Sequence, residues 1–247
     1  MGQTILTTEL PCAEKTLPPI GDEDLRRLIA FGCAEEFLTP ELSARIHENG
    51  LSSAGQDLRG LSMEALEKAV ISLMKPNRVA HVLGCRDAAA ELARRWGADE
   101  EDAARAGLLH DITKALDGEL QLTLCRAYGI ILDDFSRQNP KTLHALTGSF
   151  VAQRVFGEKP AVVSAIRSHT TGKADMDLLE KIIYVADYME PNREFEGVDT
   201  LRKLAYTDID GALRMGLEMT LAVLREQGRS VSPESSQALL WLDSKKG

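Results

Sequence analysis

The stretch "ADEEDAARAGLLHDITKAL" runs from Ala98 to Leu116 and contains the residues on which the interpretation of the whole chain depends. Four acids open it before a run of alanine and leucine, and negative charge near a helix N-terminus is favoured by the helix dipole. His110 and Asp111 then interrupt the apolar run, and Lys114 follows one turn later. Since such groups are costly to bury without partners, the stretch predicts a helix that delivers them to a site shared with other segments.

The helical period of apolar residues continues on both sides of this stretch. From Ser62 onward, apolar residues recur at steps of three and four, which is typical of amphipathic helices. Ser232 followed by Pro233 is a favourable N-cap and first-turn pair. No alternating strand pattern of useful length follows Ser62, so we predict an all-α domain. The expected helices cover residues 62–75, 77–97, 98–111, 140–157, 159–169, 175–190, 208–228 and 232–242.

The N-terminal part of the chain has a different pattern. "TILTTELP" (Thr4–Pro11) suggests one short strand, and the segments Asp22–Gly32 and Thr39–Gly50 suggest two short helices that end at glycines. Ser52–Ser62 is rich in glycine and serine, as linkers are. We therefore predict an appendage over residues 1–55 and a main helical domain over residues 56–247.

Charge and cysteine content exclude several classes of protein. The chain has 247 residues and a net charge of −9, which argues against non-specific binding to nucleic acid. Its four cysteines have no CxxC spacing, so neither a zinc knuckle nor a disulfide framework is indicated. The sequence has no signal peptide and no apolar run near the roughly 20 residues of a membrane helix. We expect a cytoplasmic protein with reduced thiols.

Four of the five histidines fall in four separate helical segments of the main domain: His81, His110, His144 and His169. The fifth, His47, belongs to the appendage and is expected on a surface helix. Any one of the four would ordinarily be a hydrogen-bonded or exposed histidine. Together they lie on faces that should be packed, and Asp187 points a carboxylate toward apolar neighbours in the same way. With Asp111 they form a set of imidazoles and carboxylates that suits a first-row divalent metal.

These residues resemble the ligand set of the HD-domain metallophosphohydrolases, and most closely its YqeK-type branch. Four motifs occur in the order of that family, namely "RVAH" (Arg78–His81), "HDITK" (His110–Lys114), "HTTG" (His169–Gly172) and "VADYMEPNR" (Val185–Arg193). The resemblance implies an all-α HD-domain bundle that hydrolyses diadenosine tetraphosphate symmetrically to two ADP by a metal-activated water. Another HD-type nucleotide phosphohydrolase, or a non-enzymatic scaffold with a structural metal, stays open as an alternative.

The resemblance also implies roles for individual residues. It places His81, His110, Asp111 and Asp187 on the metal, with His144 and His169 at a second metal position or on phosphate. The implied metal is iron, mononuclear or dinuclear, with manganese, cobalt and nickel as alternatives. Asp111 and Lys114 are expected to be catalytic, with Lys114 close enough to hold phosphate. Besides Lys114 and the ligands His81, His144, His169 and Asp187, the expected substrate contacts are Thr170, Arg193, Ser230, Val231, Ser232, Pro233, Glu234 and Ser235.

Two features qualify the resemblance. The family carries a His-Pro pair near its C-terminal helix, whereas here Ser232 precedes Pro233, so this loop departs from the family pattern. The appendage from Ile5 to Leu51 resembles the C-terminal portion of a nicotinate-nucleotide adenylyltransferase. Because the chain has no glycine-rich phosphate loop and no HxGH motif, we interpret this segment as a remnant without transferase activity. The expected partner is a dinucleoside polyphosphate or nucleotide, with no nucleic acid and no membrane, and a homodimer is left open.

Overall fold

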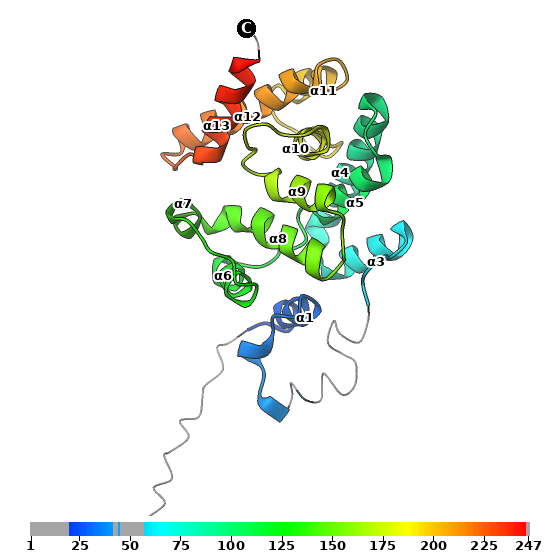
Figure 1. The fold of residues 1–247 in the computed structure, drawn as a ribbon, viewed down its shortest axis with the longest axis vertical. Helices are drawn as coiled ribbons and strands as arrows, with labels where there is room; N and C mark the ends of the chain where they lie inside the picture. The colour runs from blue at the N-terminus through cyan, green and yellow to red at the C-terminus, as the bar shows by residue number, and fades with distance from the viewer. Residues whose placement is uncertain (1–19, 42–43, 45–56, 246–247) are drawn as a thin grey trace, which may run out of the picture.

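Figure 1 shows the computed structural model of the chain, which describes residues 20–41, 44 and 57–245. Within these ranges the chain forms helices and turns and no strand, which confirms the predicted all-α class. The strand expected at Thr4–Pro11 and the histidine at position 47 lie outside the described residues, as does most of the second appendage helix. Among the described residues, no helix combines the length and the apolar character that crossing a bilayer requires.

The predicted helices of the main domain all form, and side-chain caps begin several of them. The Ser62 hydroxyl accepts from the Ala65 N–H, Asp177 forms a capping box with Glu180, and Ser232 caps the last helix. Gly97 ends a long helix at φ 81°, a left-handed conformation that glycine adopts without strain. The helices are α3 (Met63–Leu73), α4 (Pro76–Trp96), α5 (Glu100–Leu109), α8 (Leu143–Arg154), α9 (Pro160–Ser168), α10 (Leu178–Met189), α12 (Ile209–Glu226) and α13 (Pro233–Ser244).

Several shorter elements were not predicted from the sequence. They are α6 (Gly118–Ala127), α7 (Asp134–Gln138) and α11 (Val198–Ala205), whereas the 3-10 turn η2 (Pro140–Thr142) forms the start of the helix expected at residues 140–157. Asp117 and Asp133 cap α6 and α7 by accepting backbone N–H groups, so a start signal was present for each. Helix α6 and η2 pack against α8, the helix that carries His144, and α7 packs against η2.

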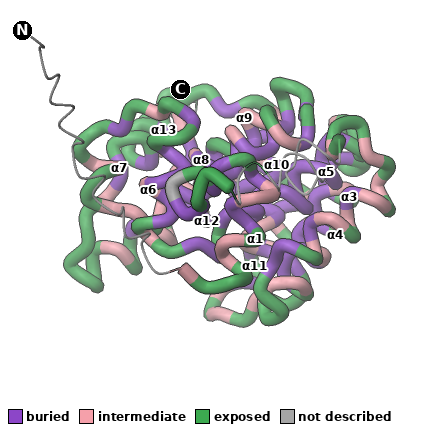
Figure 2. The backbone as a smooth tube through the Cα atoms, turned by 90° about the horizontal axis from the view of Figure 1, so that it is seen from below, coloured by how far each residue is buried: buried purple, intermediate pink, exposed green. Residues whose placement is uncertain are grey.

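Helix α10 occupies the centre of the main domain and packs against α4, α5, α9 and α12. Figure 2 shows the buried part of the chain concentrated around these helices, with exposed residues on the outer turns. Helices α4 and α5 approach closely at Gly107, where an added Cβ would lie 2.8 Å from the Cα of Arg86. This crossing, together with α10, brings the ends of α5 and α9 to the centre of the molecule.

The described part of the appendage packs against the main domain. Helix α1 (Asp22–Ala30) lies beneath α3 and α6 in Figure 1 and is followed by the 3-10 turn η1 (Glu35–Phe37). Leu28 and Phe31 join the same apolar core as α3 and α5. Arg27 is buried with α1, and its Nε donates to the Leu73 carbonyl at 2.7 Å. The domain division near residue 55 stays a prediction, but α1 and the main domain share one core.

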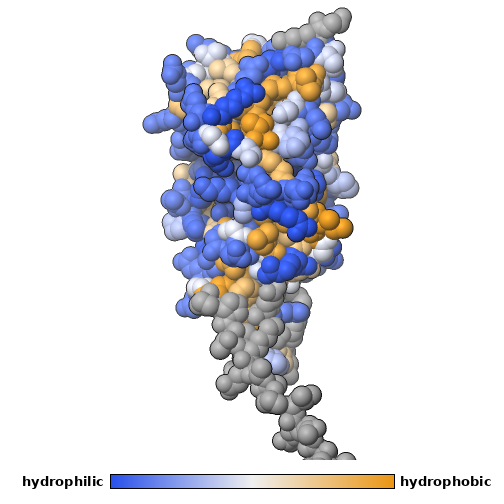
Figure 3. Space-filling view, turned by 90° about the vertical axis from the view of Figure 1, so that its left-hand side faces the viewer, coloured by the Kyte–Doolittle hydropathy of each residue, from blue (hydrophilic) through white to orange (hydrophobic). Residues whose placement is uncertain are grey.

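The outer surface is mostly polar, as the hydrophilic side chains in Figure 3 show for one face. Large apolar side chains are nevertheless exposed among the described residues at Ile131, Val223 and Leu240. They come from the turn before α7, from α12 and from α13. Isolated apolar residues of this kind are normal on protein surfaces. The clustered polar side chains of the molecule lie in its interior instead.

Candidate metal centre and adjoining pocket

The six residues predicted as metal ligands come from five parts of the bundle and meet in its interior. His81 belongs to α4 and His144 to the first turn of α8, whereas His110 and His169 are the C-caps of α5 and α9. All four histidines are at most 7% exposed. Asp111 follows α5 directly, and Asp187 lies on α10. Three overlapping groups have ligand atoms within 4.8 Å of one another, namely His81, His110 and Asp111; His110, His169 and Asp187; and Asp111, His144 and His169.

Helix α5 stops at Leu109, where the polar doublet begins, and residues 110–115 form turns. A buried network of hydrogen bonds holds this turn in place. The Thr113 hydroxyl donates to the His144 carbonyl at 3.0 Å, and Gln121 of α6 donates to the Thr113 carbonyl at 2.6 Å. Thr147 of α8 donates to the Gln121 side-chain oxygen at 2.6 Å. The turn after Asp111 is therefore fixed to α6 and α8, because buried polar groups must be paired.

The hydrogen bonds of the rings determine which nitrogen of each histidine faces the centre. The Nδ1 atoms of His110, His144 and His169 lie 2.7, 2.7 and 2.6 Å from the carbonyl oxygens of Gly107, Lys141 and Ile166. A carbonyl can only accept, so each Nδ1 carries the proton. The Nε2 lone pairs of these three rings then point into the centre. The fourth ring, His81, directs its Nδ1 at the Glu190 carboxylate and its Nε2 inward.

The Nε2 atoms are closer to one another than free lone pairs would favour. Those of His81 and His110 are 3.2 Å apart, and those of His144 and His169 are 3.1 Å apart. Burial lowers the pKa values of His110 and His144 well below the usual range, and it lowers the pKa of His169 to about 4. These three rings are therefore neutral near pH 7, the form in which imidazole binds metals.

The carboxylates complete the donor set. Asp187 Oδ1 lies 3.2 Å from His81 Nε2, and Asp111 Oδ1 lies 3.3 Å from His144 Nε2. Neutral imidazoles and carboxylates converging in a buried space are the donors that first-row divalent metals prefer. A cation at this position would relieve the lone-pair repulsion and balance both carboxylates, so the residues present fit a bound metal.

Two arginines contact these carboxylates. Arg78 Nη2 is hydrogen-bonded to Asp111 Oδ2, and Arg193 Nη2 donates to Asp187 Oδ1 at 2.5 Å. Arg193 also donates from Nε to the Asp187 carbonyl at 2.8 Å. Its predicted contact with substrate phosphate stays a prediction, since in this structure its guanidinium is engaged with Asp187. Sequence reasoning assigned no role to Arg78 or Glu190, although both lie within quoted motifs.

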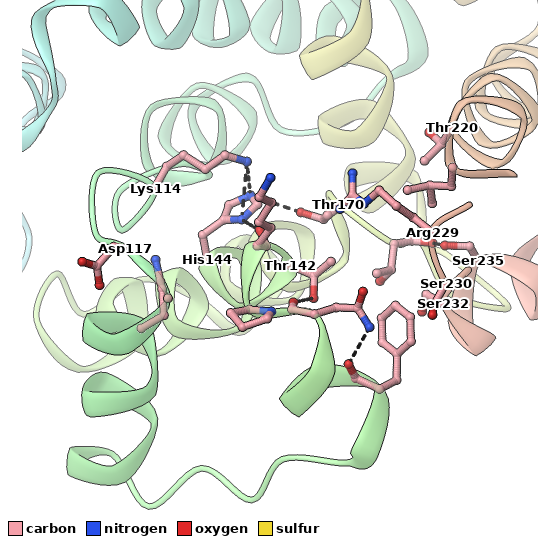
Figure 4. A pocket seen from close by; sticks show the side chains of 18 of the residues that line it. Lys114, Asp117, Thr142, His144, Thr170, Thr220, Arg229, Ser230, Ser232 and Ser235 are labelled. Carbon is pink, nitrogen blue, oxygen red and sulfur yellow. Dashed lines mark hydrogen bonds between the residues drawn. The ribbon is translucent and has the colours of Figure 1, made fainter. Parts of the chain in front are cut away.

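A pocket of about 550 Å³ opens beside the centre, and Figure 4 shows the side chains that line it. Lys114, His144 and Thr170 form the wall next to the metal centre. The loop between α12 and α13 contributes Ser230 and Ser232 on the opposite wall, and the first turn of α13 contributes Ser235. Sites of this size bind small molecules in many proteins. The pocket thus joins His144, one of the predicted ligands, to half of the contacts predicted near the C-terminal helix.

Lys114 lies where the pocket meets the metal centre. Its Nζ is 2.9 Å from His144 Nε2 and 3.8 Å from Asp111 Oδ1. Burial of the ammonium lowers its pKa to about 8. Its side chain is still 41% exposed, so it can contact a ligand that enters the pocket. The hydroxyl of Thr170 lies 3.2 Å from His169 Nε2, on the same wall.

The other residues predicted in the C-terminal loop take different positions. Pro233 and Glu234 line a smaller neighbouring cavity of about 170 Å³, and Val231 is half-buried and lines neither of the two. Glu234 accepts from the Thr171 hydroxyl at 2.8 Å, and the Ser235 hydroxyl donates to the Thr171 carbonyl at 2.7 Å. The start of α13 is therefore tied to the segment that follows His169.

Some pocket residues were not found from the sequence. Gln121, Thr142, Thr220 and Arg229 line the pocket but belong to segments with no motif. Gln121 comes from α6, which was not predicted, and Thr142 comes from η2, within the helix expected at residues 140–157. Their positions follow from packing between elements that are distant in the chain, and no local pattern indicates that packing.

Comparison with known proteins supplies independent information. Residues 78–192 match the family described as HD domain. The symmetrical bis(5'-nucleosyl)-tetraphosphatase of Bacillus subtilis (strain 168) is 39% identical over 172 residues, which cover 68% of this chain and 90% of that protein. A solved structure from Clostridium acetobutylicum, described as a predicted HD superfamily hydrolase involved in NAD metabolism, aligns with a TM-score of 0.72 and 39% identity. That alignment covers 75% of this chain and 98% of the other.

A further relative has a name that covers two activities. A Mycoplasma pneumoniae protein named probable nicotinate-nucleotide adenylyltransferase/Ap4A hydrolase is 32% identical over 167 residues. These cover 65% of this chain and 46% of that protein. Its name joins in one chain the two kinds of protein that the present sequence resembles.

Proposed function

The chain belongs to the HD-domain family that includes the symmetrical bis(5'-nucleosyl)-tetraphosphatases, and we propose that it hydrolyses diadenosine tetraphosphate to two ADP. The observation that carries this proposal is the set of inward-facing Nε2 atoms and two carboxylates beside a pocket of about 550 Å³. Such a site combines a place for a cation with room for a nucleoside arm. The relatives that share the family over most of their length support the same reaction.

The metal would be held by His81, His110, Asp111 and Asp187, with His144 and His169 available for a second ion or for phosphate. A bound divalent metal would supply a water of lowered pKa and would neutralise charge on the phosphates. We propose iron, since the resemblance implies it, with manganese, cobalt or nickel as substitutes. Metal analysis of protein purified without oxygen tests this choice, because iron would be lost or oxidised in air.

The chain's own residues would bind and orient the polyphosphate. The reaction adds one water across the bridge between the two central phosphates and releases one ADP from each side. Lys114 is placed to donate to a phosphate at the junction of pocket and centre. The hydroxyls of Thr170 and Ser230 line the same pocket and can hydrogen-bond a bound nucleotide. Lys114 also brings local positive charge to a protein whose net charge is −9 and would otherwise repel a polyanion.

Product analysis tests the reaction. Diadenosine tetraphosphate incubated with the metal-loaded full-length protein should yield ADP alone, as separated by ion-exchange chromatography. AMP and ATP in equal amounts would show asymmetric cleavage and would contradict the proposal. Hydrolysis of mononucleotides in preference to the dinucleotide would favour the alternative, another HD-type nucleotide phosphohydrolase.

A further inference from the structure

Glu190 lies directly behind His81, on the side away from the metal centre. It caps the C-terminus of α10 and is fully buried. Its Oε1 lies 3.1 Å from His81 Nδ1, the ring nitrogen that faces away from the centre. Its Oε2 accepts from both the backbone N–H and the side-chain amide of Asn192, each at 2.8 Å. The carboxylate is therefore held in one orientation, with one oxygen free to accept from His81.

Helix α4, which packs against this carboxylate, leaves room for it because it has a glycine at the point of contact. Gly84 lies one turn after His81 on α4, and a Cβ there would collide with Glu190 Oε2. The same Cβ would come within 3.0 Å of Asn192 Nδ2 and 3.3 Å of the Pro191 ring. Any other residue at position 84 would displace the carboxylate from His81. The absence of a side chain on α4 and the two hydrogen bonds from Asn192 together fix the Glu190 position.

The charge of Glu190 is balanced only weakly by neighbouring arginines and lysines. Among the described residues, its one ion pair with such a side chain is to Arg193 Nε, at a distance of 4.0 Å. A buried carboxylate without close compensation is costly. A hydrogen bond to His81 transfers part of this negative charge to Nε2, where it would be balanced by a cation among the ligands.

We propose that Glu190 is a positioning residue for the metal, acting through His81. Its Oε1 accepts a hydrogen bond from the Nδ1–H of His81, which fixes the ring's orientation and leaves the Nε2 lone pair directed at the centre. It also makes that Nε2 a stronger donor, since hydrogen bonding to a carboxylate raises the basicity of a ligating imidazole. This inference rests on the metal centre of the proposed function and extends it to a residue that does not touch the metal.

Titration with Co²⁺ tests the inference, because this ion reports both affinity and ligand strength through its visible absorption. Full-length protein stripped of metal is compared with Glu190→Gln, which keeps the shape of the side chain and removes its charge. We expect Co²⁺ to bind about 10- to 100-fold more weakly and its absorption bands to shift. Glu180→Gln is the matched control, since Glu180 is equally buried on α10 but pairs with Lys173 and Ser164. It should leave Co²⁺ affinity and spectrum unchanged.

A second variant covers the case in which Glu190→Gln does not fold. Asn192→Ala removes the side-chain amide, one of the two donors that hold Glu190 Oε2, at an exposed position, and it should weaken Co²⁺ binding in the same direction. Circular dichroism of each metal-free variant checks that the fold is retained. Folded variants that bind Co²⁺ like the parent, with unchanged spectra, would overturn the inference.

The measurement also separates this inference from the proposed function. A parent protein that binds Co²⁺ but does not hydrolyse diadenosine tetraphosphate would end the proposed function, whereas weaker binding by Glu190→Gln would still support the role of Glu190. A parent that hydrolyses the dinucleotide while Glu190→Gln binds Co²⁺ normally would end the inference alone. A parent that binds no divalent metal would overturn both.

Discussion

Single side chains that break a packing pattern were the informative signal at the residue scale. His110 and Asp111 interrupt an apolar run, and the structure places both in the interior beside the other predicted ligands. Arg78 and Glu190 gave no such signal, because a charged residue near a helix end is ordinarily solvent-exposed. Their partners lie 33 and 109 residues away in the chain, so only the fold reveals them.

The first prediction concerns the doublet at the centre. His110→Ala and Asp111→Ala should each lose bound metal and all hydrolysis, because each removes a ligand shared by overlapping groups of donors. Metal content by elemental analysis and turnover of diadenosine tetraphosphate check this. His47→Ala, which removes the one histidine outside the main domain, is the control and should behave like the parent. Full metal content and activity in either doublet variant would refute the site.

The second prediction concerns Arg193. Arg193→Ala should lower kcat/KM by about 10²-fold, and Arg193→Lys should also be impaired because lysine lacks the two-pronged donor geometry. Metal stoichiometry should stay that of the parent, since arginine is not a ligand. If Arg193→Ala loses metal instead, the role of Arg193 is to hold Asp187 through their 2.5 Å hydrogen bond, and phosphate binding must be assigned to another residue. If Arg193→Ala had the kcat/KM and the metal content of the parent, both the phosphate contact and the support of Asp187 would be excluded.

At the scale of elements, helix length explains which helices could be predicted from the sequence. The long helices α4, α10 and α12 repeat their apolar period often enough to be recognised, and caps such as Asp177 mark where they begin. Helices α7 and α11 have 5 and 8 residues, which is too short for the period to repeat clearly. The pocket wall built by α6 was missed for a related reason, since it depends on the packing of a weakly patterned segment against α8.

The third prediction tests a buried ion pair that joins two elements. Arg105 of α5 contacts Glu158, after α8, with Nη2 2.6 Å from Oε1, and its Nη1 donates to the Leu61 carbonyl at 2.9 Å. Among the described residues, removing Glu158 leaves the buried guanidinium of Arg105 with only the long ion pair to the exposed Glu101, at 3.9 Å, so Glu158→Ala should lower the free energy of unfolding by about 3–5 kcal/mol.

Urea unfolding measures this effect. Lys68→Ala serves as the matched control, because its pair with Glu64 is 74% and 80% exposed. It should change the free energy of unfolding by less than about 1 kcal/mol. Equal effects from the two substitutions would show that the Arg105 pair does not hold α5 in place.

The relation between the appendage and the main domain was the least predictable feature of the whole molecule. Arg27 looks like a surface residue in the sequence, yet it is 1% exposed and bonded to the end of α3. Tyr128, at the end of α6, also donates from its hydroxyl to the Phe31 carbonyl at 2.7 Å. Composition and glycines suggested a linker near residue 55, but they carry no information about which surface a segment packs against.

The fourth prediction follows from this arrangement. Deleting Met1–Ser53 should leave hydrolysis within a few-fold of the parent, since all six ligand residues lie beyond the deletion. The truncated protein should unfold at a lower temperature, because the apolar partners of Leu28 and Phe31 become exposed. Thermal unfolding and steady-state kinetics measure the two effects. A folded, metal-loaded truncation without turnover would show that the appendage contributes to catalysis.

The most direct test of the account is reconstitution of metal-stripped full-length protein with increasing amounts of divalent metal, with the nucleotide products measured at each step. We predict that the rate of ADP formation from diadenosine tetraphosphate rises in proportion to bound metal and saturates when the centre is filled, with no AMP or ATP formed. Full-rate hydrolysis by metal-free protein, or AMP and ATP as the products of the filled protein, would contradict it.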